Sequence, residues 1–209
     1  MRIFILIGIT CFIFSCKAQN TDFNTYLSNF KNVELPLKVD RKTYNNTFYY
    51  SNGYSEISEN WLKRYVCIDT LICLINPIEY RYDFGVKFNV NDKYNAVLIH
   101  KQKYEGDSVY DFDLSEIILT IYTEDGSIIS QKIIGKDNDG WISNIDIKKN
   151  KIITEQIKIL EFNKVESNCE IELKEYVIDN DGVIKNILTN SKRKGIVYWD
   201  NEAENFIIK

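Results

Sequence analysis

The chain has 209 residues, with 26 Lys and Arg, 30 Asp and Glu, and a formal net charge of −4 at pH 7. Its charges are interspersed without a basic patch, which argues against nucleic acid and against a polybasic membrane surface as partners. Only two prolines and nine glycines occur, and no low-complexity linker divides the chain, so we expect a single domain.

The first residues have the pattern of a secretory signal. Arg2 is the only charge before the apolar stretch from Ile3 to Phe14. This stretch is shorter than the ~20 residues that a membrane-spanning helix needs. A short positive start, a short apolar run and small residues at its end are typical of a signal peptide. A buried N-terminal strand or helix is the alternative, but it would place the charged Arg2 at the start of an apolar segment that has no polar face.

The residues Ile-Phe-Ser-Cys that end this stretch resemble the lipobox of bacterial lipoproteins, although Phe14 is bulkier than the usual residue. In that family the cysteine thiol is linked to diacylglycerol, the chain is cut before the cysteine, and the new amine is acylated. The resemblance implies that residues 1–15 are a lipoprotein signal peptide, that Cys16 is the lipid attachment point, and that residues 16–22 are a tether. Several acyl chains hold a protein stably at a membrane, whereas one does not.

The residue after the cysteine bears on location. Lys17 stands where some bacteria place the aspartate that retains lipoproteins in the inner membrane. We therefore expect a lipid-anchored protein of the bacterial cell envelope, at the outer membrane.

Two short helices are expected near the N-terminus. In residues 22–30 the apolar side chains recur with helical spacing, and Asp22 is placed to cap the helix. Residues 32–39 are expected to be extended, because the residue before Pro36 is pushed out of helical geometry. Residues 58–66 predict a second short helix.

From residue 80 onward the hydrophobic period changes to two. In residues 80–90 aromatic and aliphatic side chains alternate with polar ones, which predicts a long strand with one buried and one solvated face. We expect the core face to carry Tyr82, Phe84, Val86 and Phe88, joined by Leu119 and Ile121 from a later strand.

The rest of the chain predicts further strands separated by turns. Asp-Gly at Gly126 and at Gly182 suits hairpin turns that need a positive φ, and the ligand spacing of a calcium-binding EF-hand loop fails at both. Residues 23–209 are thus expected to form one mainly β domain, an antiparallel meander that closes as a sandwich or a barrel-like sheet. The expected strands are 80–90, 94–100, 116–123, 127–134, 141–147, 151–162, 169–178, 183–188 and 195–199.

Besides Cys16 and Cys11 of the signal, the chain has three cysteines. Cys67 and Cys73 are close enough in sequence for a disulfide across a tight turn, which an exported protein permits, but buried free thiols fit equally. We expect no metal site, because His100 is the only histidine and no C-x-x-C occurs.

The sequence carries no signature of an enzyme. There is no G-x-S-x-G elbow and no phosphate-binding glycine loop. His100 ends an apolar strand, where a structural role is favoured. A carboxylate pair for glycoside hydrolysis stays open, since 30 acidic residues always allow pairs. We predict no catalytic residues and no cofactor.

Residues 43–55, TYNNTFYYSNGYS, contain neither charges nor aliphatic side chains. Tyrosine among Ser, Asn and Gly is the composition of adaptable binding loops. One hypothesis is that Tyr44, Tyr49, Tyr50 and Tyr54 form a recognition surface for a protein or a glycan. The alternative is an edge strand whose tyrosines pack against the first helix.

The lipobox, the F..YL..F...ELP opening, the YRYDFGVKFNVNDKY strand pair and the LTIYTEDGSIISQKI hairpin together resemble a group of small, uncharacterised lipoproteins of Gram-negative bacteria. This resemblance implies an envelope location and a mostly β fold, and it brings no activity with it. Three functions stay open: a lipid-anchored binding or accessory protein, a periplasmic immunity protein that blocks a delivered toxin, and a hydrolase with a dispersed acidic site.

Overall fold

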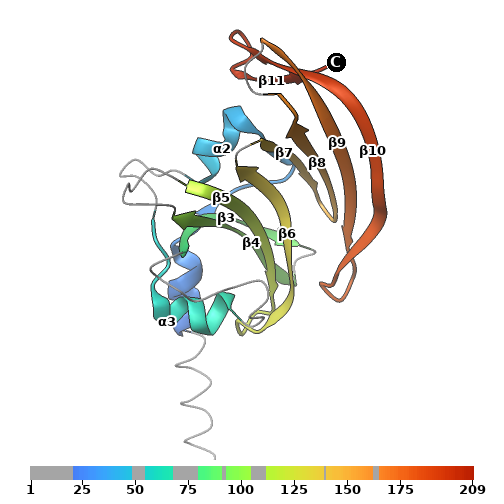
Figure 1. The fold of residues 1–209 in the computed structure, drawn as a ribbon. Helices are drawn as coiled ribbons and strands as arrows, with labels where there is room; N and C mark the ends of the chain where they lie inside the picture. The colour runs from blue at the N-terminus through green and yellow to red at the C-terminus, as the bar shows by residue number, and fades with distance from the viewer. Residues whose placement is uncertain are drawn as a thin grey trace, which may run out of the picture.

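The computed structural model describes residues 21–48, 55–67, 80–90, 93–104, 112–138, 140–161 and 165–209. The chain is mainly β, which confirms the predicted fold class (Figure 1). Its helices are residues 21–28, α2 (Arg41–Phe48) and α3 (Glu59–Trp61), which runs into a π-helical turn (Leu62–Val66). Its strands are β1 (Lys31–Asn32), β2 (Leu37–Val39), β3 (Tyr80–Val90), β4 (Tyr94–Tyr104), β5 (Phe112–Tyr122), β6 (Ile128–Asn138), β7 (Trp141–Lys148), β8 (Lys151–Ile159), β9 (Glu166–Ile178), β10 (Ile184–Asp200) and β11 (Asn205–Ile208).

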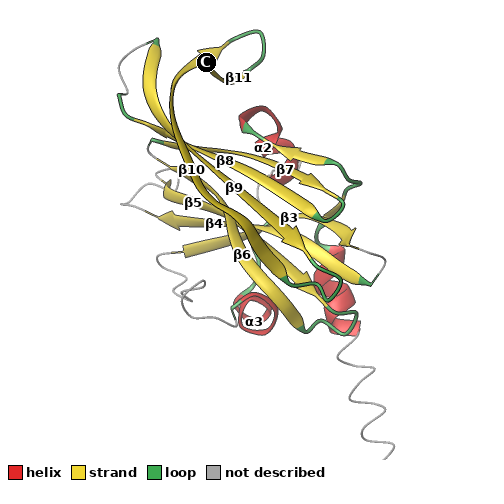
Figure 2. Ribbon diagram, turned by 90° about the vertical axis from the view of Figure 1, so that its right-hand side faces the viewer, coloured by secondary structure: helices red, strands yellow, loops and turns green. Residues whose placement is uncertain are grey.

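The strands β3 to β11 form an antiparallel meander in which each strand pairs with the next. The sheet curls into a half-barrel (Figure 2). The segment of residues 31–39 spans this curl, because β1 pairs with β3 while β2 pairs with β7. Side chains from both halves of the sheet, such as Leu98 of β4 and Ile147 of β7, meet in one buried cluster inside the curl.

A β-bulge in β3 divides the predicted core face. Two residues, Gly85 and Val86, oppose one residue of β4, so the alternation of side chains shifts by one place. Val86 and Phe88 join Leu119 and Ile121 inside the curl, as predicted. Tyr82 and Phe84 are equally buried, but they belong to a second cluster on the opposite face of the sheet. The prediction that all four share one face is therefore wrong.

The face of β3 that was expected to be solvated is also covered. Asp83 is fully buried, because α2, a helix that the sequence analysis did not predict, packs over this part of the sheet. Gly85 permits the close approach: a Cβ atom here would lie 2.5 Å from the carbonyl oxygen of Leu98 and 2.7 Å from a ring carbon of Phe48 in α2. Asp40 caps α2, with its carboxylate accepting a 3.0 Å hydrogen bond from the Thr43 N–H.

The helix over residues 21–28 covers the outer face of β3 to β5. The predicted apolar face is confirmed, since Phe23, Tyr26, Leu27 and Phe30 are all buried in the second cluster. Asp22 lies within the helix and does not cap it; its carboxylate accepts hydrogen bonds from Arg64 and from the Tyr65 hydroxyl. Residues 21 and 22, assigned to the tether, are thus helical.

The turns at the two Asp-Gly pairs are as predicted. Gly126 and Gly182 both have positive φ, 90° and 80°. The turn at Gly182, between β9 and β10, reaches back across the curl, where the Tyr94 hydroxyl donates to the carbonyl oxygen of Asn180. β10 is one long strand with register shifts where two separate strands were expected, and β11 was not predicted.

The helix of residues 21–28 and α3 lie at one end of the molecule, whereas β11 lies at the other end (Figures 1 and 2).

Candidate functional site

A groove of about 560 Å³ opens between the last strands of the sheet and the start of α2. Its walls come from β7, β8, β9, β10 and β11 and from the facing ends of α2 and β6. Its lining residues include Arg41, Asp137, Trp141, Val165, Trp199 and Phe206. Its volume lies within the range of roughly 300–1,000 Å³ that is typical of small-molecule sites.

One wall carries a pair of aromatic rings. Trp199 and Phe206 are directly opposite each other in the β10–β11 ladder, so their side chains share a face of the sheet. Their ring centroids are 5.0 Å apart in an edge-to-face arrangement. The Trp199 Nε1–H donates a 2.9 Å hydrogen bond to the side-chain oxygen of Asn201, which fixes the indole orientation. Trp199 is nevertheless 43% exposed.

Another part of the groove lining comes from the turn between β6 and β7. Gly140 has a φ of 84°, which permits the chain to enter β7 with Trp141 at the groove. The Nζ of Lys158 in β8 lies 5.8 Å from the Trp141 ring centroid, within reach of a cation–π contact.

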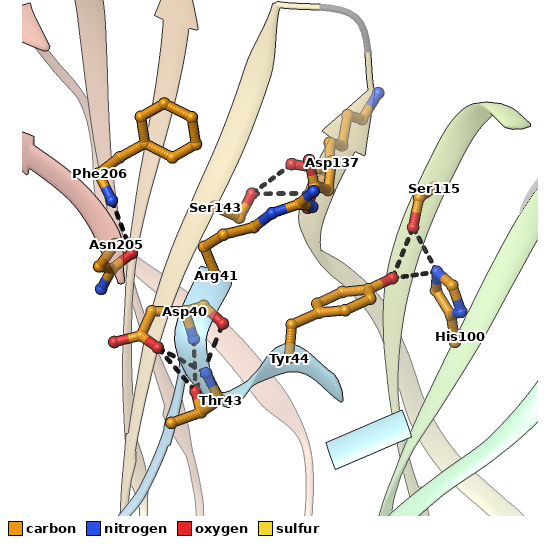
Figure 3. Close-up of polar contacts among 11 residues, drawn as sticks. Asp40, Arg41, Thr43, Tyr44, His100, Ser115, Asp137, Ser143, Asn205 and Phe206 are labelled. Carbon is orange, nitrogen blue, oxygen red and sulfur yellow. Dashed lines mark hydrogen bonds and ion pairs between the residues drawn. The ribbon is translucent and has the colours of Figure 1, made fainter. Parts of the chain in front are cut away.

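A charged pair lies at the side of the groove nearest to α2. Arg41 at the start of α2 donates a 3.3 Å hydrogen bond to the Asp137 carboxylate in β6, and Figure 3 shows both side chains. Burial raises the pKa of the Asp137 carboxyl, and the neighbouring Arg41 opposes that rise. Among the residues that line the groove, this pair supplies one positive and one negative charge.

A second polar site lies beneath α2. Figure 3 shows the Tyr44 hydroxyl, the Ser115 hydroxyl and the His100 Nε2 in mutual contact, and the Gln102 side chain lies 2.7 Å from His100 Nδ1. The carboxylate of Asp83, opposite His100 in the ladder, comes within 3.9 Å of the same nitrogen.

These residue types resemble a serine nucleophile with its base, yet the arrangement is that of a structural network. Only 2% of His100 is exposed, and burial together with the smaller effect of the nearby Arg81 lowers the pKa of its imidazole to about 3. None of the five residues lines the groove. The network instead fastens α2 to β4 and β5, in agreement with the structural role predicted for His100.

The predicted tyrosine surface is wrong at Tyr44. Only 8% of this residue is exposed, and its ring packs on Phe48 and His100, because residues 41–48 form a helix with Tyr44 on the inner face. Tyr49, Tyr50 and Tyr54 lie outside the described residues, so the hypothesis stays a prediction for them.

The other predicted site residues are cysteines. Cys67 is disulfide-bonded, while Cys73 lies outside the described residues, so the pairing between these two stays a prediction. Cys169 is a buried free thiol, and burial raises the pKa of that thiol. Cys16 also lies outside the described residues.

Sequence reasoning missed the groove. Its residues come from four separate stretches of the chain, and only the fold brings them together. The signal that was present is tryptophan: the chain has three, and two of them line this groove.

A second groove, of about 740 Å³, lies beside residues 32–36 and includes Lys148 and Lys149. Among the described residues that line it, the one aromatic residue is Phe88, of which 2% is exposed. It therefore offers a ligand no exposed ring, and the first groove is the stronger candidate.

Comparisons of the chain with protein-family models, with curated proteins and with solved structures found no significant match. Within the described ranges, no three His, Cys, Asp or Glu side chains come together as metal ligands would. None of the helices in that part of the chain has the length and apolar character needed to span a bilayer.

Proposed function

We propose that this chain is a lipid-anchored binding protein of the bacterial envelope, and that the groove between β7, β11 and α2 is its ligand site. The anchor rests on the apolar N-terminal stretch that ends in Ile-Phe-Ser-Cys. The binding role rests on the groove, where a large ring is held in place and yet left partly open to solvent.

The observation that carries the proposal is Trp199. This residue is 43% exposed. Apolar surface left in contact with water is unfavourable, since burying it is worth about 25 cal/mol per Å². Its hydrogen bond to Asn201 and its contact with Phe206 hold it in one orientation. A fixed, exposed aromatic ring in a concave site is typical of the residues that dominate binding energy.

Site-specific photo-crosslinking in intact cells tests the binding role. A photoreactive amino acid replaces Val165, which lines the groove and is 90% exposed, or Ile187, which is 59% exposed and does not line it. We expect a defined adduct from position 165 that disappears when Trp199→Ala is added, and none from position 187. Adducts of equal yield at both positions, or none at position 165, would contradict the proposal.

The anchor is tested separately by mass spectrometry of protein extracted from membranes. We expect the mature chain to begin at an acylated Cys16. A retained Met1, or an unmodified Cys16 in soluble protein, would overturn this part of the proposal and leave the groove untouched.

A further inference from the structure

We infer that the groove binds a neutral carbohydrate chain, an inference that rests on the proposed binding function and specifies its ligand. The first argument is charge. Among the described residues that line the groove, Arg41 and Asp137 are the charged ones, and they are paired with each other at 3.3 Å. This pair therefore presents no net charge to a ligand, and a neutral ligand with many hydroxyl groups does not need to separate it.

The second argument is the combination of surfaces. A pyranose ring has apolar C–H faces and a rim of hydroxyl groups, so it matches an aromatic platform that is flanked by planar polar groups. Trp199 supplies the platform, and Val165 extends the apolar surface at the rim. The orientation of the indole is already set by Asn201 and Phe206, so little side-chain freedom is lost on binding.

The third argument is hydrogen bonding. Asn201 uses its side-chain oxygen to accept from Trp199, which turns its NH₂ group away from the indole as a donor. Arg41 is 51% exposed at its side chain, and Asp137 is 22% exposed. These three groups provide donors and an acceptor around the platform, and sugar hydroxyls can both donate and accept.

Intrinsic fluorescence offers a direct test, because Trp141 and Trp199 line the groove while Trp61 does not. The full chain, held in detergent micelles, is titrated with neutral oligosaccharides of glucose, galactose, mannose and N-acetylglucosamine, and with uronic-acid oligosaccharides. We expect a saturable change with at least one neutral sugar, and weaker binding of the acidic ones.

Two variants locate the site. Trp199→Ala should weaken the binding by about tenfold or more, as loss of a stacking platform predicts. Trp61→Phe, which removes the tryptophan outside the groove, should leave the affinity unchanged, and circular dichroism verifies that both variants are folded. Asp137→Asn leaves Arg41 without its counter-charge, so this variant should gain affinity for the uronic-acid sugars.

The outcomes separate this inference from the proposed function. The absence of any saccharide-dependent change, or binding that is insensitive to Trp199→Ala, overturns the carbohydrate inference. If the Trp199-dependent adduct from position 165 forms all the same, the binding role stands and the ligand is of another class, such as a neutral peptide. If neither signal is found, both proposals fail.

Discussion

Gly85 allows β3 and α2 to approach more closely than any side chain would permit. A Cβ at this position would lie 2.5 Å from a backbone carbonyl oxygen, that of Leu98, which cannot move without disturbing β4. We expect Gly85→Ala to lower the free energy of unfolding by about 3 kcal/mol, the upper part of the usual range for overpacking. Urea denaturation measures the change.

The matched control for this change is Gly135→Ala. The nearest atom there is the Cδ1 methyl of Ile145, at 2.8 Å, which is the far end of a flexible side chain. It should therefore cost clearly less than Gly85→Ala. Equal effects would mean that the fixed carbonyl at Gly85 is not what decides the cost.

His100 predicts a pH dependence of stability. Its folded pKa of about 3 lies below the ordinary 6.5, so between these values the unfolded chain binds a proton that the folded chain does not. The stability that the neutral imidazole contributes is present above pH 6.5 and is lost as the pH falls from there toward 3. Burial raises the pKa of Asp83 to about 6, although Arg81 opposes this, so Asp83 acts with the opposite sign and partly offsets the loss.

Comparison with His100→Gln isolates the histidine, because Asp83 is present in both proteins. The free energy of unfolding of the wild type, minus that of the variant, should fall by about 2 kcal/mol between pH 7 and pH 5. Denaturant titrations at the two pH values measure it. A difference that does not change with pH would show that the imidazole is not buried in its neutral form.

At the scale of secondary-structure elements, the bulge in β3 gives the two ends of this strand different partners. Phe84 packs under the helix of residues 21–28, and 2% of its surface is exposed. We expect Phe84→Ala to destabilise the protein by about 3–5 kcal/mol, as thermal or urea denaturation would show. Ile187→Ala, at a position 59% exposed, should stay within about 0.5 kcal/mol of the wild type. A neutral Phe84→Ala would contradict the burial of this ring.

The long alternating strands could be predicted from the sequence, and β3 covers the expected residues 80–90. Hydrophobic periodicity in β3 cannot reveal the bulge, because a bulge is defined by how the strand pairs with its neighbour β4. The helix α2 was missed because RKTYNNTF lacks an aliphatic stripe, although Asp40 and Thr43 offered a capping signal.

The candidate site was beyond prediction for a related reason. Trp141 and Trp199 are 58 positions apart by their numbers, and only the fold brings both residues to the lining of one groove. The prediction for Tyr44 was wrong for another reason. The composition around this residue is that of a surface loop, but contacts with His100 and Phe48 bury its ring.

At the scale of the whole molecule, the two halves of the sheet share one core. Ile147 of β7 is fully buried in the same cluster as Leu98 of β4. We therefore expect Ile147→Ala to cost about 2–5 kcal/mol and to lower hydrogen-exchange protection in β4 as well as in β8. Unfolding should remain a single transition. A second transition, or loss of protection confined to β7 to β11, would mean that the halves fold independently.

The helix of residues 21–28 and β11 lie at opposite ends of the molecule (Figure 1), which determines how an anchored domain is oriented relative to the membrane. For a chain held by lipid at Cys16, the bilayer lies on the side of the helix of residues 21–28, and the groove beside β11 lies toward the opposite end of the molecule. The folded domain then acts as a spacer between the membrane and whatever occupies the groove. Flexible Gly-Ser residues inserted after Cys16 would leave capture of a freely diffusing sugar unchanged, but would alter access to a polymer fixed at a set height above the lipid.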